Sequence, residues 1–309
     1  MKKWLVGLAV LSLVALVLGG VALAKEKYIV ASDIPWDPFE MVTADGSQYF
    51  GFDLDVMRAI AVVEGFDIQI QNIAFDTIID TVKSGKADIG ASGFTITEKR
   101  AQSVDFSKPY YLSNQAVLIR KDSGLNIVTA LAGLGPKKAI GAQNGTTGFD
   151  WIKNNLIDKG IKVEAKGYET YPMAILDLVN GRIDAVIQDE PASRASLAAY
   201  PKKLTVAGII NTYEYFGFLV AKGDPKGILP KLNDGMEKLG LTVRKNPTGK
   251  YDLTVTPGSA WDNLMKAYFG PSSDKIEAAW LKTKDLLLNA KTLADVEKFA
   301  AAFAEEANK

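Results

Sequence analysis

The chain of 309 residues contains no histidine and no cysteine, and these two absences exclude whole classes of function. It can form no Ser-His-Asp triad, no thiol nucleophile and no ordinary structural zinc site. Disulfides are also impossible, so the core alone has to stabilise the fold. The 36 basic residues are balanced by 36 acidic ones, which argues against nucleic-acid binding because that function needs a basic surplus. The length corresponds to about two domains.

The first 24 residues have the pattern of a secretory signal peptide. Two lysines at the start are followed by an apolar stretch from Trp4 to Leu18, and Ala22-Leu23-Ala24 provides the small residues of a cleavage site. We therefore predict that the segment is cleaved near Ala24 and that the mature protein is periplasmic. An uncleaved N-terminal membrane anchor is the alternative, because about 20 apolar residues can span a bilayer.

A weak internal repeat indicates the organisation of the chain. The first copy is a strand at 28–32, a helix from Gly51, a strand at 66–70, a helix from Phe75 and a strand at 87–91; the second is a strand at 138–142, a helix from Gly148, a strand at 161–165, a helix from Tyr171 and a strand at 183–187. This order predicts, in each copy, a parallel sheet covered by helices. A single larger sheet is the alternative to two lobes.

Two β-rich stretches, 110–120 and 213–221, flank the second copy. They are expected to cross between the lobes as a two-stranded hinge, which suits closure around a ligand. We predict an α/β fold of two similar lobes. Its segments are a signal peptide (1–24), the first part of lobe 1 (25–111), lobe 2 (112–216), the return to lobe 1 (217–270) and a C-terminal helical extension (271–309).

Polar and aromatic side chains follow the predicted strands, at the sheet edge where open α/β sheets bind ligands. The candidates are Asp33, Trp36, Gly93, Thr95, Arg100, Gln143, Thr146, Thr147 and Asp189. A guanidinium binds a carboxylate through two parallel hydrogen bonds, and a carboxylate binds an ammonium, so the set is complementary to a zwitterion. Each group also has a simpler structural explanation. Thr95 and Glu98, for example, have the spacing of a helix capping box.

At these residues the chain resembles the periplasmic amino-acid-binding proteins of ABC importers. The resemblance covers Lys27 to Gly270, and its most specific motifs are Gly51-Phe52-Asp53-Leu54-Asp55, Gly85-Lys86-x-Asp88, 95–100 and 105–111. It implies a fold of the periplasmic-binding-protein type II kind and a function in binding rather than catalysis, without cofactor or metal. The implied partners are a free polar L-amino acid and the membrane permease of an ABC importer.

The resemblance also implies roles for the charged residues. Arg100 would bind the α-carboxylate of the ligand, and Asp189 would bind its α-ammonium. Thr95 would assist Arg100, together with backbone groups near Gly93, Thr146 and Thr147.

Other positions would surround the rest of the ligand. Trp36 and Phe75 would enclose it between aromatic rings, and Phe216 would contribute a wall. Asp33 and Gln143 match positions that touch the ligand side chain. Because Asp33 favours a ligand with N–H donors, we expect glutamine or a basic amino acid.

Two other functions remain open from the sequence. The first is a periplasmic enzyme on the same fold, similar to cyclohexadienyl or arogenate dehydratases, with Glu190 as general acid. The second is the ligand-sensing domain of an anchored receptor. The chain also departs from small relatives in a longer segment at 241–260 and in residues 271–309. Residues 271–309 have the pattern of two helices, which we expect to pack on lobe 1. A dimer contact or a partner surface is the alternative.

Overall fold

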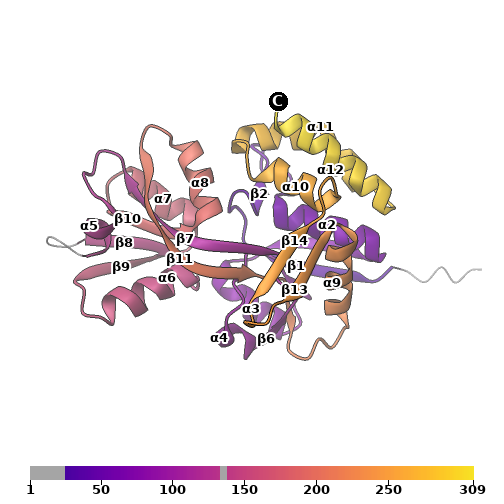
Figure 1. The fold of residues 1–309 in the computed structure, drawn as a ribbon, viewed down its shortest axis with the longest axis horizontal. Helices are drawn as coiled ribbons and strands as arrows, with labels where there is room; N and C mark the ends of the chain where they lie inside the picture. Colours follow the sequence, from indigo (N-terminus) through magenta and orange to yellow (C-terminus); the bar gives the residue numbers. More distant parts are fainter. Residues whose placement is uncertain (1–24, 133–137) are drawn as a thin grey trace, which may run out of the picture.

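The computed structural model describes residues 25–132 and 138–309, which form two α/β lobes joined by a pair of long strands (Figure 1). The predicted signal peptide, residues 1–24, lies outside the described residues. The description starts at Lys25, the residue after the predicted cleavage site. In the part of the chain that is described, no helix combines the length and the hydrophobicity needed to cross a membrane.

Lobe 1 is built on a five-stranded sheet in the order β4-β1-β5-β12-β6. Strand β1 pairs in parallel with β4 and β5, and β12 pairs antiparallel with β5 and β6. The strands are β1 (Lys27–Ser32), β4 (Asp67–Asn72), β5 (Ile89–Gly90), β6 (Val104–Phe106) and β12 (Leu219–Ala221). The helices are α2 (Phe52–Glu64), α3 (Phe75–Lys83), α4 (Glu98–Ala101) and α9 (Ile228–Lys238), and a small β2 (Met41–Val42) and β3 (Tyr49–Phe50) pair precedes α2.

Lobe 2 repeats this plan with the order β11-β7-β10-β8-β9. Its strands are β7 (Tyr111–Arg120), β8 (Lys138–Gln143), β9 (Val163–Tyr168), β10 (Ala185–Asp189) and β11 (Leu204–Phe216). Its helices are α5 (Ile127–Leu131), α6 (Thr147–Ile152) continuing into the π-helix η1 (Lys153–Ile157), α7 (Tyr171–Val179) and α8 (Glu190–Ala199). Strand β8 pairs in parallel with β9 and β10, as β1 does with β4 and β5, so the predicted internal repeat is confirmed.

The two lobes are connected by β7 and β11, which pair antiparallel from Tyr111 opposite Phe216 to Arg120 opposite Leu204. Strand β7 leaves lobe 1 and β11 returns to it, as predicted for a two-stranded hinge (Figure 1). The register shifts between Ile210 and Glu214, close to the point where β11 re-enters lobe 1. A shift of this kind bends a strand and redirects its side chains.

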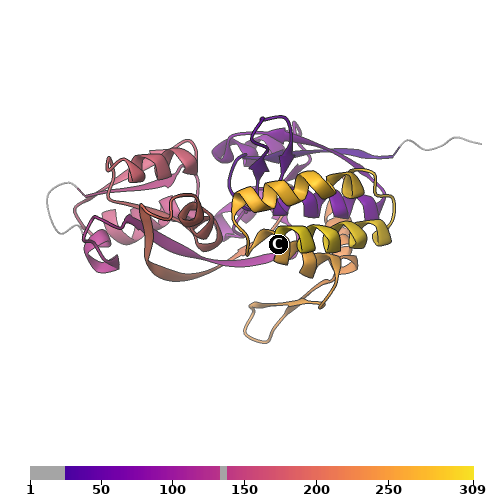
Figure 2. The same cartoon turned by 90° about the horizontal axis from the view of Figure 1, so that it is seen from above.

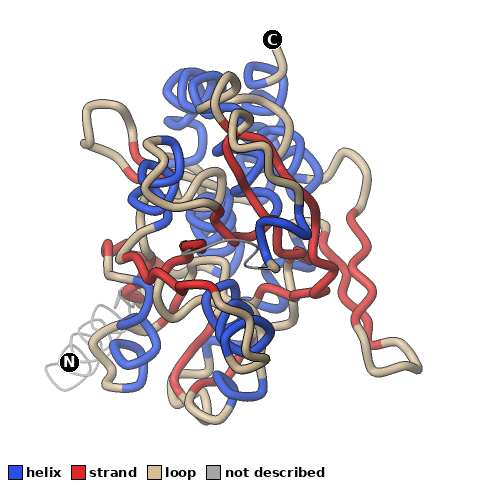
Figure 3. Tube along the Cα trace, turned by 90° about the vertical axis from the view of Figure 1, so that its left-hand side faces the viewer, coloured by secondary structure: helices blue, strands red, loops and turns tan. Residues whose placement is uncertain are grey.

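The segment after α9 forms a hairpin of β13 (Leu241–Lys245) and β14 (Tyr251–Val255), which stands away from the body of the molecule (Figures 2 and 3). Three helices follow, α10 (Ala260–Tyr268), α11 (Ser273–Leu288) and α12 (Leu293–Ala307). Helices α10 and α12 pack on each other, and all three contact α2. The prediction that the C-terminal extension packs on lobe 1 is therefore confirmed.

A buried carboxylate attaches this extension to lobe 1. Asp55 of α2 accepts hydrogen bonds from Tyr268 Oη at 2.6 Å and from Trp280 Nε1 at 2.8 Å, and it pairs with Arg58 at 2.6 Å. The Trp280 ring also stacks on Phe50 with a centroid distance of 4.7 Å. Because a buried charge is costly unless it is paired and hydrogen-bonded, the two aromatic donors belong to the structural core of lobe 1.

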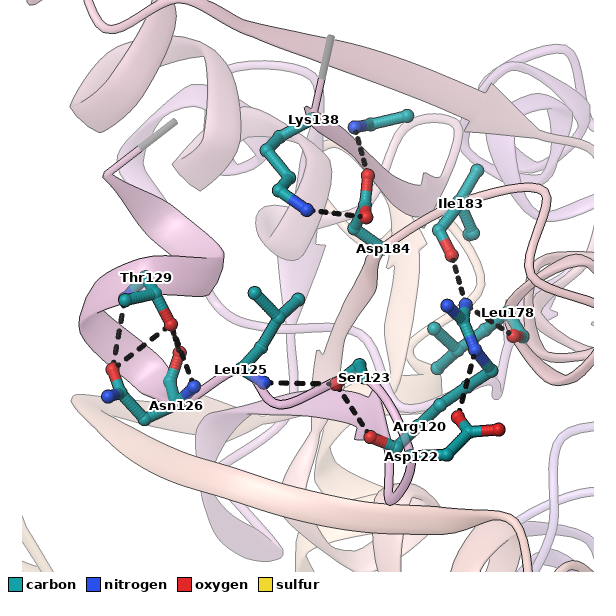
Figure 4. Close-up of polar contacts among 11 residues, drawn as sticks. Arg120, Asp122, Ser123, Leu125, Asn126, Thr129, Lys138, Leu178, Ile183 and Asp184 are labelled. Atoms are coloured by element: carbon teal, nitrogen blue, oxygen red, sulfur yellow. Dashed lines mark hydrogen bonds and ion pairs between the residues drawn. The ribbon is translucent and has the colours of Figure 1, made fainter. Parts of the chain in front are cut away.

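Polar contacts also stabilise lobe 2 at its end remote from lobe 1 (Figure 1), and Figure 4 shows them in close-up. Arg120 Nη1 donates to the carbonyl oxygens of Ile183 at 2.9 Å and Leu178 at 3.2 Å. Lys138 pairs with Asp184 at 3.0 Å. These contacts join the ends of β7, β8 and α7 and leave the opposite edge of the sheet, near the hinge, for a ligand.

Candidate functional site

A small cavity lies between the lobes, beyond the carboxyl ends of the parallel strands. Its lining residues are Asp33, Trp36, Phe75, Ser92, Gly93, Thr95 and Arg100 from lobe 1, and Gln143, Thr146, Thr147, Tyr171 and Asp189 from lobe 2. Ten of the eleven residues that we predicted from the sequence are in this set.

Topology explains why residues so distant in sequence meet. Asp33 follows β1, Gly93 follows β5, Gln143 and Asp189 end β8 and β10, and Arg100 lies on the short helix α4. The carboxyl ends of parallel strands share one edge of each sheet, and the hinge turns the two edges toward each other. The site is therefore formed only when both lobes are folded and closed.

Hydrogen bonds between the lobes show that the structure is closed. Gln143 Nε2 of lobe 2 donates to Asp33 Oδ2 of lobe 1 at 2.6 Å. Arg100 Nη2 of lobe 1 donates to the carbonyl oxygen of Gly145 at 3.0 Å.

Arg100 is the basic group of the cavity, and it is 9% exposed. Besides the bond to Gly145, its Nη1 donates to the carbonyl oxygen of Thr95 at 2.9 Å. Its guanidinium carbon lies 5.5 Å from the ring centre of Phe75 and 5.4 Å from that of Phe94. Burial lowers the pKa of Arg100, while nearby acidic groups counteract the shift. Since a guanidinium has five N–H donors, donors beyond these two are available for a carboxylate ligand.

Asp189 is the acidic group on the opposite side of the same cavity. It is 6% exposed, and its Oδ1 has no hydrogen-bond partner among the described residues. Burial raises the pKa of Asp189 well above its usual range, and the neighbouring charge of Glu214 adds to the shift. A buried carboxylate oxygen without a partner is costly, and a cationic donor in the cavity would remove this cost.

A second acidic group lies at Asp33. Burial raises the pKa of this carboxyl to about 6, although the hydrogen bond from Gln143 opposes the shift. The charges of Asp76 and Glu169 raise it further. This acidic region lies where the bond between Asp33 and Gln143 joins the lobes, so a ligand that binds here has to replace or accept that bond.

The aromatic walls come from both lobes. The Trp36 ring lies 6.2 Å from that of Tyr171 at an angle of 23° between planes, and Phe75 stacks on Phe94 at 4.6 Å. Phe216 is placed differently from our prediction. It is fully buried and packs behind Trp36 at 6.3 Å, so it supports the cavity wall without being among the lining residues. The cause is its position at the end of β11, inside the aromatic core of lobe 1.

Gly93 has to be glycine for two reasons. Its φ of +55° is a left-handed conformation, and a Cβ atom there would lie 2.3 Å from Cζ3 of Trp36. Its N–H donates to Oδ2 of the buried Asp53 at 2.9 Å. The glycine thus lets the chain pass directly under the indole ring.

Three residues of this region were not predicted from the sequence: Ser92, Tyr171 and Glu214. Ser92 Oγ accepts the N–H of Asp33 at 3.1 Å. Tyr171 begins α7 and lines the cavity, as Phe75 begins α3. Because these two aromatic residues are equivalent in the internal repeat, the repeat itself was the signal that would have identified Tyr171.

Glu190, the general acid of the alternative enzymatic function, is directed elsewhere. It forms an ion pair with Arg194 on α8. It lines a different hollow, between α8 and the Phe269–Ser273 segment, and is not among the residues that line the cavity of Arg100 and Asp189.

Two α/β lobes of this topology, joined by a two-stranded hinge around a charged cavity, define the class of type II periplasmic binding proteins. Within this class, residues 28–240 match the family of bacterial extracellular solute-binding proteins, family 3, and the chain belongs to it.

Relatives that are named for the amino acid they bind occur in this family. The chain is 33% identical over 267 residues to a probable histidine-binding protein of Neisseria gonorrhoeae, covering 82% of this chain and 93% of the relative. It is 33% identical to the ABC transporter arginine-binding protein 1 of Escherichia coli, over 70% of this chain and 86% of the relative. The solved structure of an ancestral arginine-binding protein bound to arginine matches with a TM-score of 0.67 at 29% identity, over 80% of this chain and 99% of that chain.

Proposed function

We propose that this solute-binding protein captures a free polar L-amino acid between its lobes and delivers it, without chemical change, to the membrane permease of an ABC importer. The protein would act outside the cytoplasm after cleavage near Ala24, or anchored by an uncleaved N-terminus. A basic amino acid is the first candidate ligand, with arginine ahead of histidine and glutamine. The names of the relatives and the acidic region at Asp33 support this order.

The single observation that carries the proposal is the pair of Arg100 and Asp189. Both side chains are buried, they have opposite charges, and they line one cavity in which Asp189 Oδ1 has no partner among the described residues. A ligand with a carboxylate and an ammonium on one carbon supplies a partner to each. Arg100 would take the α-carboxylate, and Asp189 the α-ammonium.

The remaining contacts follow from the lining. Trp36, Phe75 and Tyr171 would enclose the ligand, and the ligand side chain would reach Asp33 and Gln143. A guanidinium presents several N–H donors to a carboxylate, which an uncharged amide does less well. This difference favours arginine over glutamine.

The direct test is a thermal-shift panel of the twenty amino acids followed by isothermal titration calorimetry. A ligand of micromolar affinity, about 8 kcal/mol, should raise the unfolding midpoint, because it binds only the folded protein. Arg100→Met should weaken arginine binding by roughly two to three orders of magnitude. Arg194→Met, which removes an exposed arginine from α8, is the matched control and should leave affinity unchanged. If no amino acid shifts the midpoint, the proposed function is wrong.

A further inference from the structure

The hinge strand β11 carries a local irregularity beside the cavity. Between the pairs Ile210–Gln115 and Glu214–Ser113, three residues of β11 lie opposite one residue of β7. Tyr213, in this bulge, has a φ of +52° and is 56% exposed. The residue after it, Glu214, is 8% exposed. The bulge therefore turns Tyr213 outward and Glu214 inward, toward the place where the lobes meet.

The carboxylate of Glu214 joins the two lobes through one oxygen. Its Oε2 accepts hydrogen bonds from Oγ1 of Thr95 at 2.7 Å and from Oγ1 of Thr147 at 2.5 Å. Thr95 belongs to lobe 1 and Thr147 begins α6 of lobe 2. The other oxygen, Oε1, accepts from Nε2 of Gln115 on β7 at 3.1 Å. Four segments, from both lobes and both hinge strands, thus meet at a single side chain.

The hydroxyls of Thr95 and Thr147 cannot donate to Glu214 and to a ligand at the same time. A threonine hydroxyl has one proton, and Thr95 and Thr147 each donate theirs to Oε2 of Glu214. While Thr95 and Thr147 donate to Glu214, neither hydroxyl has a proton left for the carboxylate of a ligand. The two hydroxyls therefore connect the lobes, and donation to the ligand α-carboxylate falls to Arg100 and to backbone N–H groups.

We propose that Glu214 is a positioning residue for ligand binding, which holds Thr95 and Thr147 in register and so stabilises the closed form. The inference rests on the proposed function for its ligand but not for its geometry. Thr95 is bridged to Phe216 at the end of β11, so the bond that crosses between the lobes is the one from Thr147 to Glu214. We expect opening of the lobes to break this bond, and its loss therefore acts on ligand dissociation. Association starts from the open form and is affected little.

Stopped-flow measurements with arginine test the kinetic part. Glu214→Ala should raise the dissociation rate by roughly 10- to 100-fold, because two charge-assisted hydrogen bonds are lost. Glu214→Gln keeps the volume and an accepting oxygen, so its effect should be smaller and in the same direction. Association rates should stay within about threefold. Glu164→Gln, which changes an exposed glutamate on β9, is the matched control.

A double-mutant cycle separates positioning from direct ligand contact. Thr147→Val should speed dissociation in the parent protein but add little in the Glu214→Ala background, because the bond it removes is already absent. Additive effects would overturn the proposal, as would Glu214→Ala dissociating at the parental rate. If Glu214→Ala does not fold, judged by circular dichroism, the same cycle is carried out with Glu214→Gln.

A ligand-independent readout separates this inference from the proposed function. Since the chain has no cysteine, Lys86→Cys and Lys159→Cys introduce one unique dye site on each lobe. Single-molecule energy transfer on ligand-free protein should show longer lobe-to-lobe distances in the Glu214→Ala background. If the parent protein binds no amino acid, the proposed function fails while this measurement still decides the role of Glu214. Identical distance distributions in the two backgrounds would overturn it.

Discussion

Asp189→Asn should weaken amino-acid binding and at the same time stabilise the ligand-free protein. The parent carboxylate is buried and has one oxygen without a hydrogen-bond partner among the described residues. In the complex, the ligand ammonium would pair with it. In the empty protein, the same charge is a cost, because burial disfavours the ionised form and the charge of Glu214 is close. Asparagine keeps the shape and removes the charge.

The expected magnitude follows from these two states. Loss of one member of a buried charge pair costs about 3–5 kcal/mol, which corresponds to roughly two to four orders of magnitude in the dissociation constant. Relief of an unpartnered buried group in the empty protein is worth about 1–3 kcal/mol. For a chain of this size, that gain raises the unfolding midpoint by a few degrees, at roughly 2 °C or more per kcal/mol.

The gain in stability of the ligand-free Asp189→Asn protein should depend on pH, and the raised pKa of Asp189 gives the direction. The pKa of Asp189 is higher in the folded protein than its ordinary value of 3.8. Its contribution to stability is therefore complete below 3.8 and is lost as the pH rises through the raised value. The advantage of Asp189→Asn should be largest at alkaline pH and should shrink as the solution is acidified.

Calorimetric titration with arginine and scanning calorimetry of the empty protein, each at pH 8.5 and pH 5.5, measure both effects. Asn154→Ala, a change at an exposed residue of η1, serves as a control for the general effect of a substitution in lobe 2. A variant that binds arginine within fivefold of the parent would refute the assignment of the ammonium site. An empty variant that is less stable than the parent at both pH values would refute the argument about buried charge.

Three further outcomes are expected. Lowering the pH from 7.5 to 5 should weaken arginine binding about tenfold or more, because the Asp33 carboxyl, with a pKa of about 6, is then mostly protonated. In calorimetry, Asp33→Asn should reduce this dependence and leave the part that comes from Asp189, whose pKa is also raised. Gly93→Ala should weaken binding at least about tenfold in the same assay, since its Cβ displaces Trp36; full affinity would contradict the close packing. Trp280→Ala should lower the unfolding midpoint by roughly 6 to 15 °C, because it removes a buried ring that stacks on Phe50 and donates to Asp55. It should leave the affinity within about threefold, because Trp280 is not among the residues that line the cavity. A large loss of affinity would show that the extension acts on the site.

Much of the candidate site was predictable because strand ends can be read from sequence. Hydrophobic periodicity locates the parallel strands, and residues directly after them, such as Asp33, Gln143 and Asp189, necessarily reach the ligand edge of the sheet. The internal repeat predicted the two lobes in the same way. The absence of histidine and cysteine excluded most catalytic alternatives on chemical grounds alone.

Other features depend on long-range geometry that no local pattern encodes. Glu214 reaches Thr95 and Thr147, which line the cavity, because a bulge in β11 changes which strand residues face inward. The place of this bulge depends on the pairing with β7. Phe216 packs behind Trp36 because it lies at the end of β11, inside the aromatic core of lobe 1. The sequence by itself determined the fold class and the charged poles of the site. Only the tertiary structure decided which side chains face the ligand and which join the lobes, since that choice depends on strand register and lobe closure.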